Sequence, residues 1–522
     1  MKPPAMPDWA AGAKRLLPAR RPSLPSPSWN TLRRPPAALV VVALLVGGTV
    51  AADQTHTPLR PVLGNSLKRI APVVGSIAVC PDALSTKGVT TRISAGTGSA
   101  GSARIGAIAL AAGASEKIVA DEGARVGEFA LSGEDSVAVV ATATGEQAGG
   151  MAAEQVTRAE TGQQHGLSSV RCEPAIADSW YVGAATTISD RSELLLVNPY
   201  DDAATVDVEL YTRKGRVDPP GTTGISVKAR SRVVKAIADW VQDEAWLAVH
   251  VVVRSGRVSP AVRRMRTVRQ QPSGVDWLPR SAAPQEEIGV GALPGGEGER
   301  TLLLVNPGLD VLTVRVQVTL QDGQFRPIDL ADIEVPGQQL VSVPLTAELD
   351  GKSAMLTVIT DGPPALAAAY AEYTDPAVPG VDFVYAAGMA PLSGSALLTD
   401  NRVGEKVDTA LMFSAPEGPA EITLTEVLAP DAVGPARTQL VPVKQGALVV
   451  VALSRAFGRG DPLPIVVTVS ANSAPVYGTR VIVEKSARGP LVTALGIQGQ
   501  LGGVPLPEVE HDPRGWLMTP RG

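Results

Sequence analysis

The chain has 522 residues and a net charge of −5, and it is too long to fold around a single core. Gly and Pro are frequent, at 52 and 44 residues, whereas aromatic residues make up 4%, a composition that favours short strands joined by turns over long helices. Residues 1–36 carry seven basic side chains and one acidic one, which leaves a net charge of −11 on the rest. Because phosphate binding needs concentrated positive charge, nucleic acid is an unfavourable partner.

The first predicted elements are a disordered basic cytoplasmic tail over 1–36 and an uncharged stretch, "AALVVVALLVGGTVAA", over 37–52. A helix of this length spans about 24 Å, short of the roughly 30 Å hydrocarbon core. The stretch is therefore predicted to be a short transmembrane anchor or the apolar part of a signal peptide, cleaved among the small residues at 49–52. A buried soluble helix is disfavoured by the flanking charges.

Because basic residues stay on the cytoplasmic side, the predicted protein is a single-pass component of the cell membrane with residues 53–522 facing outward. The lipid bilayer is then a partner through residues 37–52, and residues 53–72 form a linker.

The only cysteines are Cys80 and Cys172, each at the end of an apolar strand pattern, "GSIAVC" and "GLSSVRC". An even cysteine count in an exported chain predicts one disulfide, which would tie the first strand of a domain to its last. Two free thiols are the alternative. No metal site is predicted, since neither cysteine has a neighbouring His or Cys ligand.

Two stretches, "ELLLVNPYDDAATVDVELYTRKG" from Glu193 and "TLLLVNPGLDVLTVRVQVTLQDG" from Thr301, align over 23 residues with 11 identities. In each stretch "LLLV" reads as a strand, "NP" as a turn, and the following alternation as a half-buried antiparallel strand. The inward residues would be Val206, Val208 and Leu210 in the first copy. The repetition indicates a duplicated structural unit and not a catalytic motif.

A weaker third copy begins at Ala410, and a divergent version follows the linker. Units of about 106 residues with about seven short strands have the size of an immunoglobulin-like β-sandwich; a propeller or another all-β form is the alternative. The predicted fold is all-β, with tandem sandwiches after one membrane helix. Trp180, Trp277 and Phe383 are expected at the starts of successive units as core anchors, with ligand-stacking aromatics as the alternative. The predicted domains are 73–175 (with the disulfide), 176–270, 271–379 and 380–486, followed by a C-terminal tail, 487–522.

The basic tail, the single membrane segment and the repeated Val-, Ala- and Gly-rich units with "LLLVNP" resemble an uncharacterised family of actinobacterial membrane-tethered extracytoplasmic proteins. Members of that family tend to be encoded beside cell-envelope glycosyltransferases. The resemblance implies a place in envelope biology, and it supplies no catalytic residue.

No constellation for catalysis is found in the sequence. There are four histidines, no G-x-S-x-G motif, and His250 lies within the strand pattern "AVHVVV". The chain is therefore predicted to have no catalytic residues, no cofactor and no metal, and not to be an enzyme.

One run of basic residues stands out on an acidic body. The guanidinium group of arginine binds carboxylates and phosphates through paired hydrogen bonds. The run is therefore a candidate contact for anionic lipid, an acidic envelope polymer or an acidic protein. A solvated strand face is the alternative. The run comprises Arg254, Arg257, Arg263, Arg264, Arg266 and Arg269.

These observations predict a non-catalytic, membrane-anchored scaffold or accessory protein of the bacterial cell envelope, serving a membrane or envelope protein such as a glycosyltransferase. Its sandwiches are expected to stand in line, with binding by loops at their ends. The alternative is a glycan-binding or carbohydrate-active cell-surface protein, which would need a cleft holding two carboxylates beside an exposed aromatic.

Overall fold

The computed structural model describes residues 70–505, except 84–87, 99–103, 112–113, 115, 121–124, 130–135, 147, 161, 163–164, 269, 331, 376–377, 430–431 and 501–502. Residues 69–507 form one compact unit. The predicted tail, anchor and most of the linker lie outside the described residues. Among the helices that the structure describes, none has the length and apolar character needed to cross a membrane.

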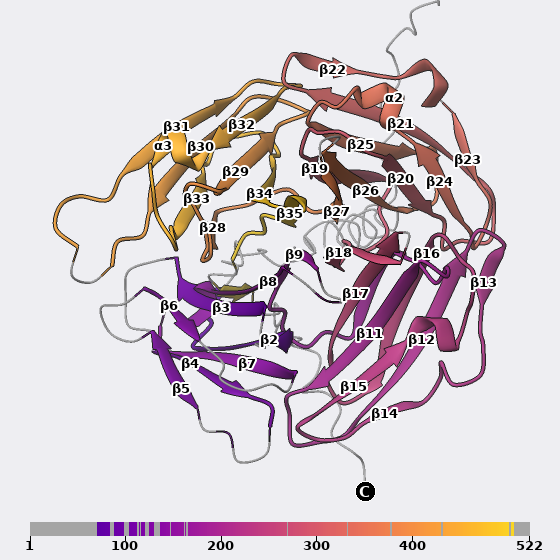
Figure 1. The fold of residues 1–522 in the computed structure, drawn as a ribbon, viewed down its shortest axis with the longest axis horizontal. Helices are drawn as coiled ribbons and strands as arrows, with labels where there is room; N and C mark the ends of the chain where they lie inside the picture. Colours follow the sequence, from indigo (N-terminus) through magenta and orange to yellow (C-terminus); the bar gives the residue numbers. More distant parts are fainter. Residues whose placement is uncertain are drawn as a thin grey trace, which may run out of the picture. The chain divides into compact units, whose positions relative to one another are not determined.

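The regular secondary structure of the described residues is almost entirely β-strand, arranged as four sandwich-like modules (Figure 1). Modules 1, 2 and 4 have two sheets each, whereas in module 3 the first and last strands pair and join the two sheets into one of nine strands. Module 1 contains β2 (Gly75–Ala83), β3 (Val89–Thr97), β4 (Arg104–Ala109), β5 (Lys117–Ala120), β6 (Val126–Phe129), β7 (Val137–Thr144), the 3-10 turn η1 (Ala148–Gly150), β8 (Met151–Ala159) and β9 (Gly166–Arg171). Module 2 contains β10 (Asp178–Ala184), β11 (Asp190–Asn198), β12 (Ala204–Thr212), β13 (Gly215–Val217), β14 (Ile225–Val227), β15 (Ser231–Ala236), η2 (Ile237–Asp239), β16 (Leu247–Ser255), β17 (Ser259–Val268) and β18 (Gln271–Leu278).

Modules 3 and 4 repeat the plan. Module 3 contains β19 (Glu287–Leu293), β20 (Arg300–Val305), β21 (Leu312–Leu320), β22 (Gly323–Phe325), η3 (Ile328–Leu330), β23 (Ile333–Val335), β24 (Leu340–Pro344), α2 (Thr346–Leu349), β25 (Ala354–Thr360), β26 (Leu366–Asp375) and β27 (Val378–Met389). Module 4 contains β28 (Ser395–Leu398), β29 (Val407–Ser414), β30 (Ala420–Glu426), β31 (Thr438–Val443), β32 (Leu448–Ala452), α3 (Leu453–Ala456), β33 (Ile465–Val469), β34 (Tyr477–Ser486) and β35 (Gly489–Gly496).

Every module has the same strand order. Numbered within a module, the first sheet runs 1-6-3-4 and the second 5-2-7-8, as in β2-β7-β4-β5 and β6-β3-β8-β9 of module 1. Modules 2 and 3 add the short strands β13 and β22. An immunoglobulin sandwich likewise pairs its second strand with its fifth and its third with its sixth, but it leaves the seventh beside the sixth. Here the seventh strand joins the second, so the immunoglobulin order is matched only in part.

The last strands of modules 2, 3 and 4 extend beyond the predicted domain ends. β18 begins at Gln271 and pairs with β17, β27 pairs with β26, and β35 pairs with β34. The boundaries predicted after residues 270 and 486 therefore fall between paired strands, and the boundary after residue 379 falls within β27. Trp277 and Phe383 lie in these final strands, and Trp180 lies in a first strand, so the three are not equivalent positions. All are buried, but Trp180 and Trp277 pack at junctions between modules, and Phe383 of module 3 packs into the core of module 2.

The predicted alternation in the third strand is confirmed. In β12, Val206, Val208 and Leu210 are fully buried between the two sheets, while the intervening residues are partly exposed. β21 alternates in the same way. One covered face is what period-two patterning predicts for an antiparallel strand.

The "LLLV" run has two buried faces. In β11, Leu194 and Leu196 point into the core of module 2, whereas Leu195 packs against Trp277 and a residue of module 1. A continuous apolar run is the pattern of a strand covered on both sides. The second cover is the neighbouring module.

The same face is used at each junction between modules. In module 3, Leu303 packs against Trp180 of module 2, and in module 4, Met412 packs into the core of module 3. In module 1, the equivalent residue Ser94 donates a hydrogen bond to Thr399 of module 4 at 2.7 Å. The contacts therefore close into a cycle, in which each module rests on the preceding one and module 1 rests on module 4. The modules do not stand in line.

At the middle of this cycle lie the four last strands, β9, β18, β27 and β35, each contacting the next (Figure 1). The ends of the unit also meet, because β1 (Ile70–Pro72) pairs with β36 (Gly503–Pro505) in an antiparallel two-stranded sheet.

Candidate binding site at the ends of the central strands

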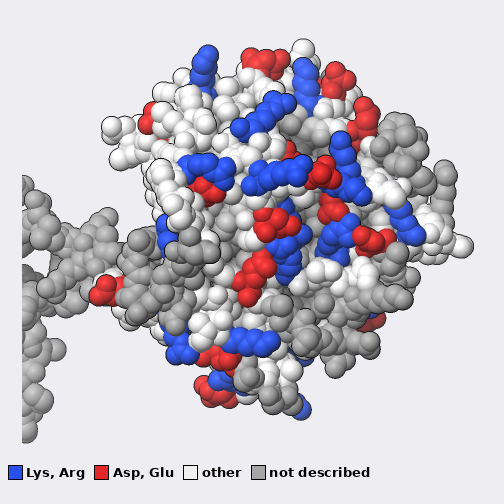
Figure 2. Space-filling view, turned by 60° about the vertical axis from the view of Figure 1, so that its left-hand side comes forward, with Lys and Arg blue, Asp and Glu red and all other residues white. Residues whose placement is uncertain are grey.

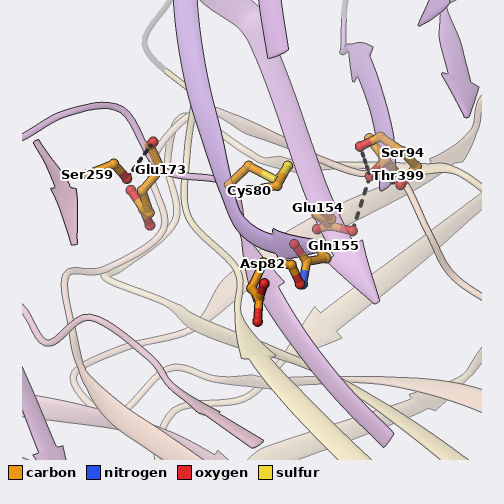
Figure 3. Close-up of a disulfide and its surroundings, with 9 residues drawn as sticks. Cys80, Asp82, Ser94, Glu154, Gln155, Glu173, Ser259 and Thr399 are labelled. Carbon is orange, nitrogen blue, oxygen red and sulfur yellow. Dashed lines mark hydrogen bonds between the residues drawn. A yellow bond between two sulfur atoms is a disulfide. The ribbon is translucent and has the colours of Figure 1, made fainter. Parts of the chain in front are cut away.

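The disulfide predicted from the sequence is confirmed. Cys80 in β2 is bonded to Cys172, directly after β9, and both are buried in module 1. Figure 3 shows that contacts to other modules flank the bond: Glu173 accepts a hydrogen bond from Ser259 of module 2, and Glu154 accepts one from Thr399 of module 4. The bond thus fixes the part of module 1 that touches both neighbours.

Arg263 of the predicted anion-contact run is used inside the molecule. Its guanidinium donates to Asp82 of module 1 at 2.7 Å and to Glu193 of module 2 at 2.8 Å, and it lies over the Trp277 ring. Burial alone would raise the pKa of Glu193, but the hydrogen bonds and charge of Arg263 outweigh it and lower that pKa. Arg232 also pairs with Asp82, which makes this cluster an ionic joint between modules 1 and 2.

Arg264 and Arg266 join modules 2 and 3. Arg264 is 3% exposed; it donates to Asp190 at 2.8 Å and to the Tyr385 hydroxyl of module 3 at 2.7 Å. Arg266 donates to the Tyr370 hydroxyl at 2.7 Å and pairs with Glu372, both in module 3. Burial raises the pKa of the Tyr385 hydroxyl, so it remains a neutral partner for the guanidinium.

The other three residues of the run have separate positions. Arg254 is exposed and pairs with Asp207 at 2.7 Å, and Arg257 lies over the Tyr200 ring. Arg269 lies outside the described residues. Arg263, Arg264 and Arg266 are thus committed to joints between modules. Figure 2 shows a face on which basic and acidic side chains lie beside each other.

His250 is a strand residue, and it is held on both sides. Its Nδ1 lies 2.9 Å from Glu209 and its Nε2 lies 2.8 Å from Asp178, while the ring stacks on Trp180 at 3.9 Å. The three polar residues tie together β12, β16 and β10. No hydroxyl or thiol nucleophile is paired with this imidazole in the described structure, so the arrangement has the character of a structural clamp.

Each of the four central strands carries a buried polar residue near the centre of the unit. These residues are Ser169, Asp276, Asp382 and Thr493, and all four are buried. The Ser169 and Thr493 hydroxyls are 2.7 Å apart, and Thr493 donates to Asp276 at 3.3 Å. One hydrogen-bonded cluster therefore joins the four modules at their centre.

Asp382 is the carboxyl of the cluster that accepts more hydrogen bonds from the backbone. It accepts backbone N–H bonds from Val492 at 2.9 Å, from Phe383 at 3.0 Å and from Leu167 at 3.2 Å. Gly274 has φ +107°, and a Cβ there would lie 2.8 Å from an Asp382 oxygen. The glycine of "GVDWLP" is thus required by the close approach of two central strands.

Asp276 receives less support. Its Oδ1 accepts from the Trp277 N–H at 2.9 Å, but its Oδ2 is buried with no hydrogen-bond partner. Burial, together with the charge of Asp382, raises its pKa well above the usual range. Burial raises the pKa of Asp382 too, and at both carboxyls hydrogen bonds from backbone N–H groups oppose the rise. We expect Asp276, whose Oδ2 has no hydrogen-bond partner, to hold a proton more readily than Asp382.

A cavity opens where the central strands end. Its larger part, about 260 Å³, lies between modules 2, 3 and 4, and a smaller part of about 40 Å³ extends toward module 1. Arg280 and Gln498 line both parts, so the two lie next to each other. Arg280 follows β18, and Gln498 follows β35.

The ionisable residues that line the cavity are Arg171, Glu173 and Arg280. Arg280 donates to Glu173 at 3.0 Å, and this charge raises the pKa of Arg280. Arg171 is half-buried and forms no ion pair with any residue that the structure describes. The cavity therefore carries one uncompensated positive charge. Its aromatic lining, Tyr181 and Trp277, is 3% exposed and offers no stacking platform.

The two buried carboxyls of the central cluster could have been found from the sequence. Asp276 and Asp382 stand at the same place in "GVDWLP" and "GVDFVY", and an acid conserved between repeats inside an apolar strand indicates a buried polar contact. Arg171 and Arg280 had no such signal, because the two residues come together only when modules 1 and 2 pack.

The comparisons with known proteins add a family. The sequence pattern of a family described as "Family of unknown function (DUF5719)" matches residues 130–454. No curated protein matches the chain. Among solved structures, the crystal structure of Streptomyces avermitilis alpha-L-rhamnosidase complexed with L-rhamnose is 11% identical over 81% of this chain and 57% of that chain, with a TM-score of 0.12. A TM-score of that size carries no argument about fold or activity.

Proposed function

We propose for this chain, which belongs to the DUF5719 family of unknown function, a non-catalytic role as a membrane-anchored extracytoplasmic scaffold or accessory protein of the bacterial cell envelope. Its partner would be a membrane protein, such as a glycosyltransferase. The immunoglobulin-like character of its sandwiches, its actinobacterial origin and its single-pass topology belong to the same proposal.

The observation that carries the proposal is the closed cycle of modules. Each module buries one sheet face on its neighbour, and buried ion pairs such as Arg480–Glu154 at 2.6 Å reinforce the junctions. Such contacts make a rigid body, which suits a protein that holds a partner in place. The buried disulfide supports an oxidising compartment.

The carbohydrate-active alternative is less well supported. Hydrolysis of a glycoside by the common route needs two carboxyl groups about 5–10 Å apart. The described lining of the cavity contains one carboxylate, Glu173, and that group is already paired with Arg280.

A topology experiment tests the location. Full-length protein is expressed in its native host, membranes are washed with alkaline carbonate, and intact cells whose outer layers have been removed are treated with protease. The proposal predicts that the chain stays with the membrane and that residues 70–505 are reached by the protease. Release by carbonate, or protection until the cells are lysed, would contradict it.

A crosslinking experiment tests the partner. Membranes are crosslinked, the tagged full chain is purified, and crosslinked peptides are identified by mass spectrometry. We expect recurrent links between the body and one membrane protein. A chain that links only to itself would count against the accessory role.

A further inference from the structure

We infer that the cavity at the ends of the central strands binds a small molecule carrying a carboxylate or phosphate group, with Arg171 as the residue that recognises the anion. The inference goes beyond the proposed function and stands without it, because binding to purified protein needs neither a membrane nor a partner protein.

The first argument is the volume of the cavity. Its larger part, about 260 Å³, approaches the lower end of the range of small-molecule sites, about 300 Å³. Three modules supply its walls, which is the position at which ligand sites commonly form. The space is large enough for one small polar molecule and too small for a polymer chain to pass through.

The second argument is the charge. Glu173 and Arg280 neutralise each other at 3.0 Å, whereas Arg171, on the neighbouring strand end, has no acidic partner in the described structure. A half-buried guanidinium without a counter-charge favours an anion, since its fork matches the geometry of carboxylate and phosphate oxygens. The body of the chain is acidic, so this site is an exception to the protein's overall charge.

The third argument is the polar lining around the arginines. Ser281, Ser393 and Gln498 line the larger part of the cavity. Hydroxyl and amide groups donate and accept hydrogen bonds, which suits a ligand with hydroxyls beside its anionic group. The lining therefore favours a polar anion over an apolar acid such as a fatty acid.

Isothermal titration calorimetry of the full-length protein in detergent micelles tests the inference, with sodium D-glucuronate, inorganic phosphate and D-glucose as probes. We expect glucuronate or phosphate to bind and glucose not to bind. Tighter binding of glucuronate assigns a carboxylate ligand, and tighter binding of phosphate assigns a phosphate ligand. No binding of either anion, or equal binding of glucose, would overturn the inference.

Two variants shift affinity in opposite directions. Arg171→Gln should weaken binding of the anion by about tenfold or more, because a charge-assisted hydrogen bond is lost. Glu173→Gln should strengthen binding, because it removes a negative charge from the cavity and frees Arg280. Opposite shifts cannot both come from partial unfolding.

The matched control is Arg459→Gln, which changes a 77% exposed arginine paired only with exposed Glu405. It should leave the affinity unchanged. An equal loss in Arg459→Gln and Arg171→Gln would show a general effect of charge, and the assignment to the cavity would fail.

Discussion

Modules 1 and 3 share one strand order, but they fill the space between their sheets differently. The core of module 1 is mostly alanine, with the Cys80–Cys172 bond and few large side chains such as Phe129. The core of module 3 is mostly leucine and valine, with Leu302, Leu304 and Val316 fully buried. Burial of apolar area stabilises in proportion to that area, so module 1 gains less from its own core. The comparison teaches that module 1 depends on its crosslink and its neighbours.

Removal of the disulfide should have the largest effect on the difference in stability between modules 1 and 3. The double variant Cys80→Ser/Cys172→Ser should lower the free energy of unfolding of module 1 by about 4–5 kcal/mol, since the bond closes a long loop. Hydrogen exchange should show lost protection in β2–β9 and retained protection in modules 2 and 3. A loss of similar size in all modules, or none under oxidising conditions, would contradict the expected dependence.

The next largest effect is expected at the junction between modules 4 and 1. Arg480→Met leaves Glu154 buried without its cation, at a cost of about 3–5 kcal/mol in chemical denaturation. The double variant Arg480→Met/Glu154→Gln should recover part of that loss, because no uncompensated charge remains. If the double variant is as unstable as the single one, the ion pair is not what holds this junction.

A smaller effect on stability is expected at the turns that follow the second strand of modules 3 and 4. Asn306 donates to the Asp310 and Val335 carbonyls and accepts from the Gly308 N–H. In module 4 the equivalent residue is Ala415, and the hydroxyl of Ser414, at the position of Val305, is buried with no partner. Asn306→Ala should lower the midpoint of urea unfolding by the equivalent of about 2 kcal/mol, and Ser414→Ala should change it by less than about 0.5 kcal/mol. Equal effects would show that the turn network contributes nothing.

The smallest expected effect concerns pH and the central cluster. The pKa of Asp276 is raised in the folded state, so its contribution to stability is full below its unfolded pKa of about 3.8 and is lost as pH rises toward the folded pKa. Asp276→Asn should remove that loss and raise stability at pH 8 by about 1 kcal/mol. Thermal melts at pH 5 and pH 8 measure it; an unchanged pH dependence in the variant would exclude Asp276 as the proton carrier.

Local pattern was enough to predict the strands, the inward residues of β12 and the disulfide, because each depends on residues close in sequence or on a simple count. The cyclic packing could not be predicted in this way. In the sequence, Leu195 is an ordinary apolar residue; only the fold shows that Trp277 and module 1 cover it. Arg263 likewise has the pattern of an exposed charge, because its partner Asp82 lies 181 residues away in the chain. The uninterrupted "LLLV" run was the sequence signal for this packing, because in a strand with one solvent-exposed face apolar and polar residues alternate.

The pairing of β1 with β36 brings the entry and exit of the cycle to one place, with Ile70 opposite Pro505. A cycle of four equivalent units has no structural first member, so the position of the natural termini is only one of several that the packing allows. A circular permutant that joins residues 69 and 506 by a short linker and opens the chain between modules 2 and 3 should fold to the same body. An anchor attached at the new opening would then present a different edge of that body to whatever surface holds it.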